Sequence, residues 1–241
     1  MNRLGRAAVM VSIGAMAARL LWSGGYGWFV QQHMFIPLLL AAVVLIAFGA
    51  FEIAVGIREE QRIGATSRWR VAPTVGWLLL LPLAVLVAVA PTGLGAAAAS
   101  RIEAFSPTEQ TDEFPPLDTG GGPVEMRVYD FLDRAIWDDE RSLDGVAVRL
   151  EGLVVNDDEI ADGFQLTRFL VSCCAADGIP LQVALRGLDA PLEDNTWVIA
   201  DVVWIEPDVP YADSGLRIVE AEILSIEPQP GVRKDPYESP Y

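Results

Sequence analysis

Two adjacent cysteines are the residues of this sequence best suited to chemistry. Cys173 and Cys174 are the two cysteines of the chain, and they stand together in the segment RFLVSCCAADG, which runs from Arg168 to Gly178. Two thiolates bind soft metal ions such as Zn²⁺ or Cu(I), and the carboxylate of Asp177 is close enough in sequence to add a third ligand. The candidate binding residues are therefore Arg168, Cys173, Cys174 and Asp177.

Three interpretations of the cysteine pair remain open. The thiols can pack as small apolar groups in a β core, because free cysteine is among the most buried residue types. They can form a vicinal disulfide, although so small a ring distorts the peptide. They can form a soft-metal or thiol-exchange site, with zinc as the possible cofactor, although the usual C-x₂₋₄-C spacing is missing. The sulfurs can meet only where the strand ends, and Asp177-Gly178 predicts such an end.

Sequence motifs of common enzymes are missing from the chain. It has one histidine, His33, and it has no G-x-S-x-G, no H-E-x-x-H and no glycine-rich phosphate loop. His33 falls at the end of an apolar segment, where a polar boundary residue is expected. We therefore expect a protein that is not an enzyme.

The charges divide the chain into two halves of different character. Residues 1–99 contain 7 arginines and 3 glutamates, whereas residues 100–241 contain 10 basic and 30 acidic residues. The basic residues of the second half are scattered singly, and the net charge of this half is −20, so it would repel a phosphate backbone. Nucleic acid is thus excluded as a partner.

The first half contains three apolar segments, which predict an α-helical membrane region with spans at about 7–22, 34–57 and 77–99. Segment 7–22 is interpreted as a retained span, with a cleaved signal peptide as the alternative. Glu52 in the second segment either marks an ion or substrate path or reaches the membrane interface near the helix end. The expected environment of residues 1–99 is the lipid bilayer.

Four arginines between the second and third spans predict the orientation of the chain. Arg58, Arg62, Arg68 and Arg70 all lie in the loop of residues 58–76, whereas residues 23–34 contain no Lys or Arg. Positively charged loops remain on the cytoplasmic side. We therefore predict a multi-pass protein of the cell membrane whose loop 58–76 is cytoplasmic and whose C-terminal domain is extracytoplasmic.

The second half predicts a flexible linker followed by a mainly-β domain. Residues 100–123 are rich in Pro, Gly and acidic residues, and residues 124–241 form the domain. An amphipathic helix is expected at 124–138, and alternating apolar residues predict five strands, at 146–155, 164–174, 179–186, 197–205 and 216–226. Five short strands with one flanking helix favour a small OB-like barrel, with an open sandwich as the alternative.

The whole chain resembles the YcgQ-like family of bacterial two-component permease subunits, an uncharacterised membrane protein family. The features that carry the resemblance are the short N-terminal spans, the stretch Ser172-Cys173-Cys174-Ala175-Ala176-Asp177 and the C-terminal Asp235-Pro236-Tyr237. The resemblance implies a larger multi-span permease as the partner. The leading hypothesis is therefore an accessory subunit of a membrane transport system, with an outer β domain that captures or gates substrate. The rival hypothesis is an envelope metal- or thiol-responsive binding protein that uses Cys173 and Cys174.

Overall fold

The computed structural model of the chain contains two compact units, Met1–Gly93 and Leu94–Tyr241. The residues that it describes are 3–63, 93–102, 114–160, 162–188, 190–207, 218–230 and 236–240.

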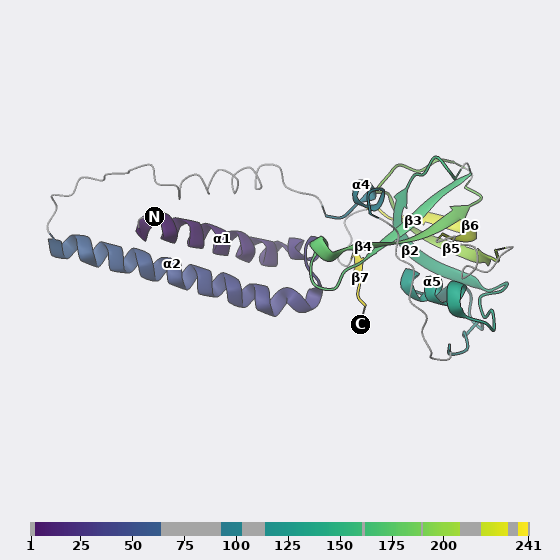
Figure 1. Cartoon of the computed structure of the whole chain (residues 1–241), viewed down its shortest axis with the longest axis horizontal. Coiled ribbons are helices and arrows are strands. Elements are labelled where there is room, and N and C mark those ends of the chain that lie inside the picture. The colour runs from purple at the N-terminus through teal and green to yellow at the C-terminus, as the bar shows by residue number, and fades with distance from the viewer. Residues whose placement is uncertain are drawn as a thin grey trace. The chain divides into compact units, whose positions relative to one another are not determined.

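The first unit is a pair of antiparallel helices, α1 (Arg3–Ser23) and α2 (Phe35–Ile63), seen side by side in Figure 1. The connection between them contains two short 3-10 helices, η1 (Gly25–Trp28) and η2 (Gln32–Met34). Gly24, at φ 72°, supplies the left-handed residue that ends α1. His33 lies in η2, directly before α2 begins.

Small residues line the contact between α1 and α2. Ala7 and Ala42 are buried, and a Cβ atom added to Gly49 would lie 2.5 Å from Cγ2 of Val11. A Cβ atom on Gly14 would likewise lie 2.7 Å from Cγ1 of Ile46. The two backbones therefore approach more closely than larger side chains would allow, as small residues permit in membrane helix pairs.

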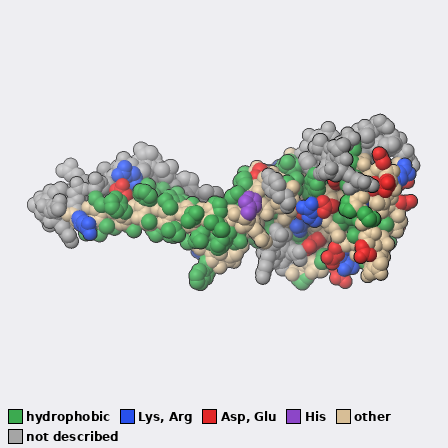
Figure 2. All heavy atoms as spheres, turned by 90° about the horizontal axis from the view of Figure 1, so that it is seen from below, with side chains coloured by type: hydrophobic (Ala, Val, Ile, Leu, Met, Phe, Trp, Pro, Cys, Tyr) green, Lys and Arg blue, Asp and Glu red, His purple; other side chains and the backbone are tan. Residues whose placement is uncertain are grey.

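Among the described residues, two helices are long and apolar enough to cross a membrane, over Gly5–Ser23 and Gln32–Arg58. These contain the segments 7–22 and 34–57 that the sequence predicts. Hydrophobic side chains cover most of the helical surface visible in Figure 2. Glu52, the carboxylate in the second segment, accepts a hydrogen bond from Arg6 of α1 at 3.3 Å.

The third predicted span, 77–99, lies outside the described residues as far as residue 92. Its last residues belong to the second unit, where Ala96–Ala99 form the single turn α4. The backbone N–H of Leu94 donates to the Tyr237 hydroxyl at 3.2 Å, and that of Ala96 donates to Oδ1 of Asn195 at 2.7 Å. Residues 94–99 are therefore fixed to the β domain.

The second unit is a mainly-β domain with one substantial helix, α5. Four of the five predicted strands match observed strands within a few residues, and the strands predicted at 179–186 and 197–205 have the observed bounds. The strand predicted at 164–174 ends earlier, at Leu170. The helix predicted at 124–138 begins at Val128, because Val124 and Glu125 pair with a strand. In chain order the elements are β1 (Val124–Glu125), α5 (Val128–Trp137), β2 (Ala147–Val155), β3 (Gly163–Leu170), η3 (Ala175–Asp177), β4 (Ile179–Arg186), β5 (Trp197–Ile205), β6 (Val219–Pro228) and β7 (Tyr237–Glu238).

In the described part of the domain, the strands form one seven-stranded sheet in the order β1-β2-β5-β6-β4-β3-β7, and β2 also pairs with β3. If the pairings are followed from β2 through β3, β4, β6 and β5, they lead back to β2. Strands β4 and β6 are parallel, and the other four pairs of this cycle are antiparallel. The short strands β1 and β7 add parallel pairs to β2 and β3.

Large apolar side chains fill the interior of the β domain. Phe131 and Leu132 on the apolar face of α5 pack with Phe164, Leu166 and other strand residues in the main core. A smaller cluster joins α4 to the strands through Phe169, Trp197 and Tyr237. The described end of the predicted linker is also attached, because Leu117 packs on the main core and the Pro115 carbonyl accepts a hydrogen bond from Arg134.

Candidate functional site

The two cysteines lie in the connection between β3 and β4. Strand β3 ends at Leu170, and the chain bends at Ser172 and Cys173 before the short turn η3 begins. The carboxylate of Asp177 holds this bend, because it accepts backbone N–H bonds from Ser172 at 3.0 Å, Cys173 at 2.8 Å and Cys174 at 3.3 Å. The chain therefore turns in the segment before Gly178, where the sequence predicts that the strand ends.

The bend brings three possible metal ligands together. The sulfurs of Cys173 and Cys174 and a carboxylate oxygen of Asp177 all lie within 4.8 Å of one another. Zinc–sulfur bonds of about 2.3 Å at tetrahedral angles place two sulfurs about 3.8 Å apart, which lies within this limit. The three atoms therefore suit a soft-metal site with three protein ligands and one open position, which water or a partner would fill.

The cysteine pair is exposed at the surface and is not part of the core. Cys173 is exposed, Cys174 is half-buried, and both thiols are free. Of the three interpretations, packing inside the β core does not match this placement, and no disulfide joins these two residues. A metal or thiol-exchange site is the interpretation that the geometry favours.

Hydrogen bonding at the bend keeps the Cys173 thiol protonated. Its bond to Asp177, together with the bond to Cys174, raises the pKa of the thiol from 9.0 to about 11. The Asp177 carboxyl loses solvation, but the bonds that it accepts from Cys173 and the backbone outweigh this loss and lower its pKa. A metal ion would have to displace the thiol protons, so its affinity would rise with pH.

Arg168, the fourth candidate binding residue, lies away from this cluster. It is buried on β3, its guanidinium carbon lies 5.1 Å from the centre of the Trp197 ring, and its Nε lies 3.7 Å from Oε1 of Glu238. The structure therefore brings together Cys173, Cys174 and Asp177 but assigns Arg168 to a second polar region.

That second region surrounds a cavity of about 730 Å³ between α5, β1, β2 and the segment before β1. Its lining is unusually rich in charge, and it combines residues from widely separated parts of the sequence. The charged residues that line it are Glu125, Arg127, Asp130, Asp133, Arg134, Arg149, Glu151, Arg168 and Glu238.

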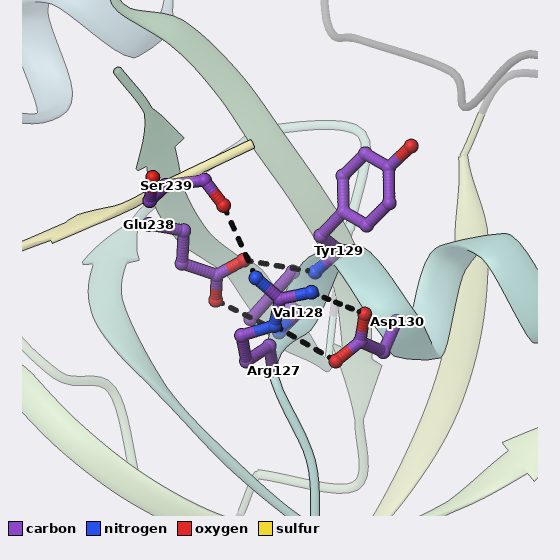
Figure 3. A network of polar contacts seen from close by, with 6 residues as sticks. All are labelled: Arg127, Val128, Tyr129, Asp130, Glu238 and Ser239. Carbon is purple, nitrogen blue, oxygen red and sulfur yellow. Dashed lines mark hydrogen bonds and ion pairs between the residues drawn. The ribbon is translucent and has the colours of Figure 1, made fainter. Parts of the chain in front are cut away.

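Glu238 of β7 closes one end of this region by capping helix α5, as Figure 3 shows. Its carboxylate accepts N–H bonds from Val128 at 2.8 Å and Tyr129 at 3.0 Å. These are donors at the first turn of the helix, where a negative charge is favoured. Burial nevertheless raises the pKa of the Glu238 carboxyl, against the opposing effects of Arg168 and the two N–H donors.

The other arginines of the lining are also held by neighbouring groups. Arg127 donates two hydrogen bonds to Asp130, at 2.7 and 2.8 Å, and a third to the Ser239 carbonyl at 3.1 Å. Arg149 faces Asp201 across β2 and β5 and donates to it at 2.7 and 2.9 Å. That pair lowers the pKa of the Asp201 carboxyl, chiefly through the hydrogen bond from Arg149.

Asp133 differs from Glu238, the other buried carboxylate of the lining. Its side chain is 6% exposed, and in the part of the chain that the structure describes its Oδ1 atom has no hydrogen-bond partner. Burial, and then the charge of Asp130, raises the pKa of the Asp133 carboxyl. The sequence shows Asp133 as one of several acids on an amphipathic helix, so nothing there separates it from a solvated residue.

Comparisons of this chain with protein-family models, with curated proteins and with solved structures found no match.

Proposed function

We propose that this chain is an accessory subunit of a membrane transport system, in which α1 and α2 lie in the bilayer and bind a larger permease. The observation that carries the proposal is the outer surface of α2. Leu40, Phe48 and Phe51 are all 60–64% exposed, and so large an apolar surface on a helix is stable in lipid or against another membrane helix.

The contact between the two helices supports the same proposal. Association of helices in lipid depends on close backbone packing, which Gly14 and Gly49 allow here. The Arg6–Glu52 pair gives the one carboxylate of the second apolar segment a partner within the helix pair. A structural role is therefore enough to explain Glu52, and an ion or substrate path is not needed.

We further propose that β2 to β6 form a small barrel of the OB type. The cycle of pairings β2–β3–β4–β6–β5–β2 supports this, because a closed barrel pairs its last strand back to its first. A register shift between Asp201 and Val202, where β5 pairs β6, supplies the local bend that a small barrel needs. Helix α5 precedes this cycle in the chain. The short strands β1 and β7 lie outside the cycle and pair with β2 and β3.

The proposed arrangement places the β domain outside the cell, where it captures or gates the transported substrate without a catalytic reaction. An export-dependent reporter enzyme fused after residue 241 is expected to be active, and a reporter that works in the cytoplasm is expected to be silent. The opposite pattern would overturn the orientation.

Affinity purification in mild detergent tests the partner. The full chain, tagged and expressed in its native membrane, is expected to retain a multi-span permease. Replacing Leu40, Phe48 and Phe51 by alanine together should release the permease and leave the chain in the membrane. The matched control is Leu224→Ala, which removes an exposed apolar side chain of the β domain, 57% exposed. A wild-type chain that consistently purifies alone would refute the partnership.

A second candidate function, soft-metal or thiol-responsive binding, is favoured by the cluster of Cys173, Cys174 and Asp177. Co²⁺ is a useful probe in place of Zn²⁺, because thiolate–cobalt bonds give strong near-ultraviolet absorption. The full chain in detergent is expected to show this absorption, and Cys173→Ser and Cys174→Ser should each remove most of it. Ser172→Ala is the control. No thiolate absorption in the reduced wild-type chain would exclude this function.

A further inference from the structure

The cavity beside α5 contains a buried carboxylate oxygen, Oδ1 of Asp133, that has no hydrogen-bond partner among the described residues. We propose that this cavity binds a small organic cation that carries an ammonium or guanidinium group, with the Asp133 carboxylate as its principal partner. The binding site does not depend on whether the chain associates with a permease.

The size of the cavity favours an organic ligand over a single ion. Its volume of about 730 Å³ falls within the range of small-molecule sites, roughly 300–1,000 Å³, and is many times that of one hydrated ion. Leu117, Met126 and Ile199 contribute apolar surface to the lining. These side chains would cover the carbon atoms of the ligand while the polar groups bind its charged end.

The arginines of the cavity already have anionic partners within the domain. Each has a carboxylate of the domain within 4 Å, in the pairs Arg127–Asp130, Arg134–Asp138, Arg149–Asp201 and Arg168–Glu238. Arg134 also donates to the Ser142 hydroxyl at 2.8 Å and to the Pro115 carbonyl at 2.6 Å. An anion would have to compete with these partners, and this is most costly at Arg134 and Arg168, whose pairs are buried.

Asp133 is the lining carboxylate that keeps a buried, unused acceptor. The four lining arginines face five lining carboxylates, and Asp138 and Asp201 add two more from outside the lining. Asp133 is more than nine-tenths buried, and its Oδ1 has no partner among the described residues. A buried carboxylate without a partner is unfavourable, so a ligand that brings a positive donor gains the energy that Asp133 lacks.

The field of the whole C-terminal half acts in the same direction. Its 30 acidic and 10 basic residues give residues 100–241 a net charge of −20. A protein surface of one sign concentrates ligands of the opposite sign and speeds their association. Cations therefore reach this cavity at a higher local concentration than anions do.

Isothermal titration of the full chain in detergent with agmatine tests the inference, since agmatine carries both an ammonium and a guanidinium group. Wild type is expected to bind it with one site, and Asp133→Asn should weaken binding at least tenfold, the loss typical of one buried charged hydrogen bond. Asp139→Asn makes the same change at an exposed position outside the lining and should bind like wild type.

Several results would overturn the inference. These are no agmatine binding to wild type, equal binding to the Asp133→Asn chain, preferential binding of succinate, or binding of Mg²⁺ in place of agmatine. If the Asp133→Asn chain does not fold, Glu125→Gln provides the second variant, because Glu125 lines the same cavity and is exposed. That variant should also weaken agmatine binding, and unchanged affinity there would refute the site. Purification with a permease plays no part in these measurements, so the two proposals can fail independently.

Discussion

The helix pair and the β domain are built with opposite distributions of apolar side chains. In the helix pair small residues such as Ala7 and Ala42 are buried, and large ones such as Phe48 face outward. In the β domain Phe131 and Phe164 are fully buried, and most exposed side chains are polar or charged. The hydrophobic effect places large apolar groups inside only where the surroundings are water. This contrast is expected if lipid surrounds the helix pair and water surrounds the β domain.

The two regions also use an arginine–glutamate pair differently. Arg6 and Glu52 join the two helices at 3.3 Å and keep 42% and 25% of their side chains exposed. Arg168 and Glu238 join β3 to β7 with 10% and 4% exposed, and Glu238 also caps α5. The Arg168–Glu238 pair is withdrawn from water and helps to fix the arrangement of its neighbours. The Arg6–Glu52 pair lies near the end of the apolar stretch of α2, where long charged side chains can reach water.

Truncating one phenylalanine in each region gives the largest expected effect. Phe164→Ala should lower the free energy of unfolding of the β domain by about 3–5 kcal/mol, because it leaves a cavity in a packed core. Phe48→Ala should change the stability of the helix pair by less than about 0.5 kcal/mol, because its side chain is 61% exposed. Urea titration of the full chain in detergent, followed by hydrogen exchange and mass spectrometry, resolves the two units. Equal losses at both positions would break the comparison.

The two ion pairs give the next largest difference. Glu238→Ala should cost the β domain about 3 kcal/mol, because it uncaps α5 and leaves Arg168 buried without this carboxylate. Glu52→Ala should cost the helix pair at most about 1 kcal/mol, because Glu52 lies near the end of the apolar stretch Gln32–Arg58, where a charged side chain can reach water at the interface. The same hydrogen-exchange measurement compares them, with faster exchange in α5 as the specific sign of the lost cap. A larger effect at Glu52 would mean that the helix-pair contact is the more strongly desolvated one.

Regular periodicity explains why most of the fold could be predicted. The strand at 197–205 is a short apolar run rich in Val and Ile, and α5 repeats its apolar residues at helical spacing, so each pattern is contained within one segment. Strands β1 and β7 have two residues each and exist because distant strands pair with them. No local pattern of that length distinguishes a strand from a loop.

The two candidate sites also differ in whether their residues lie close together in the sequence. Cys173, Cys174 and Asp177 lie within five residues, and the turn chemistry of Asp177-Gly178 predicts their bend. The cavity joins Glu125, Asp133 and Glu238, which only the tertiary fold brings together. Arg168 was predicted from its place beside the cysteines, whereas its partners come from β7 and from the start of β5. A site made by long-range pairing leaves no signal in residue spacing.

Enlarging a small residue between the helices tests the packing side of the comparison. Gly49→Leu should cost the helix pair about 1–3 kcal/mol, because even a Cβ atom there would lie 2.5 Å from Val11. Gly56→Leu on the same helix should have almost no effect, since nothing lies within 4 Å of a Cβ atom at that position. Hydrogen exchange of α1 and α2 in mild detergent is the measurement. Similar exchange in the two variants would argue against a tight contact at Gly49.

The smallest expected effect is at the cysteine bend. Hydrogen bonds between polar groups at the surface of the β domain stabilise this bend, and the core contributes little to it. Asp177→Asn removes the acceptor that does most to raise the pKa of the Cys173 thiol to about 11. Since the thiolate is the reactive form, alkylation of Cys173 at pH 8 should become about tenfold faster, one factor of ten for each pKa unit. Wild-type alkylation should keep rising with pH up to the raised pKa, and the rate in the variant should level off at lower pH. Iodoacetamide labelling followed by mass spectrometry measures both rates, with the exposed Asp158→Asn as the matched control. A variant whose pH profile matches that of wild type would show that the bend does not control the thiol.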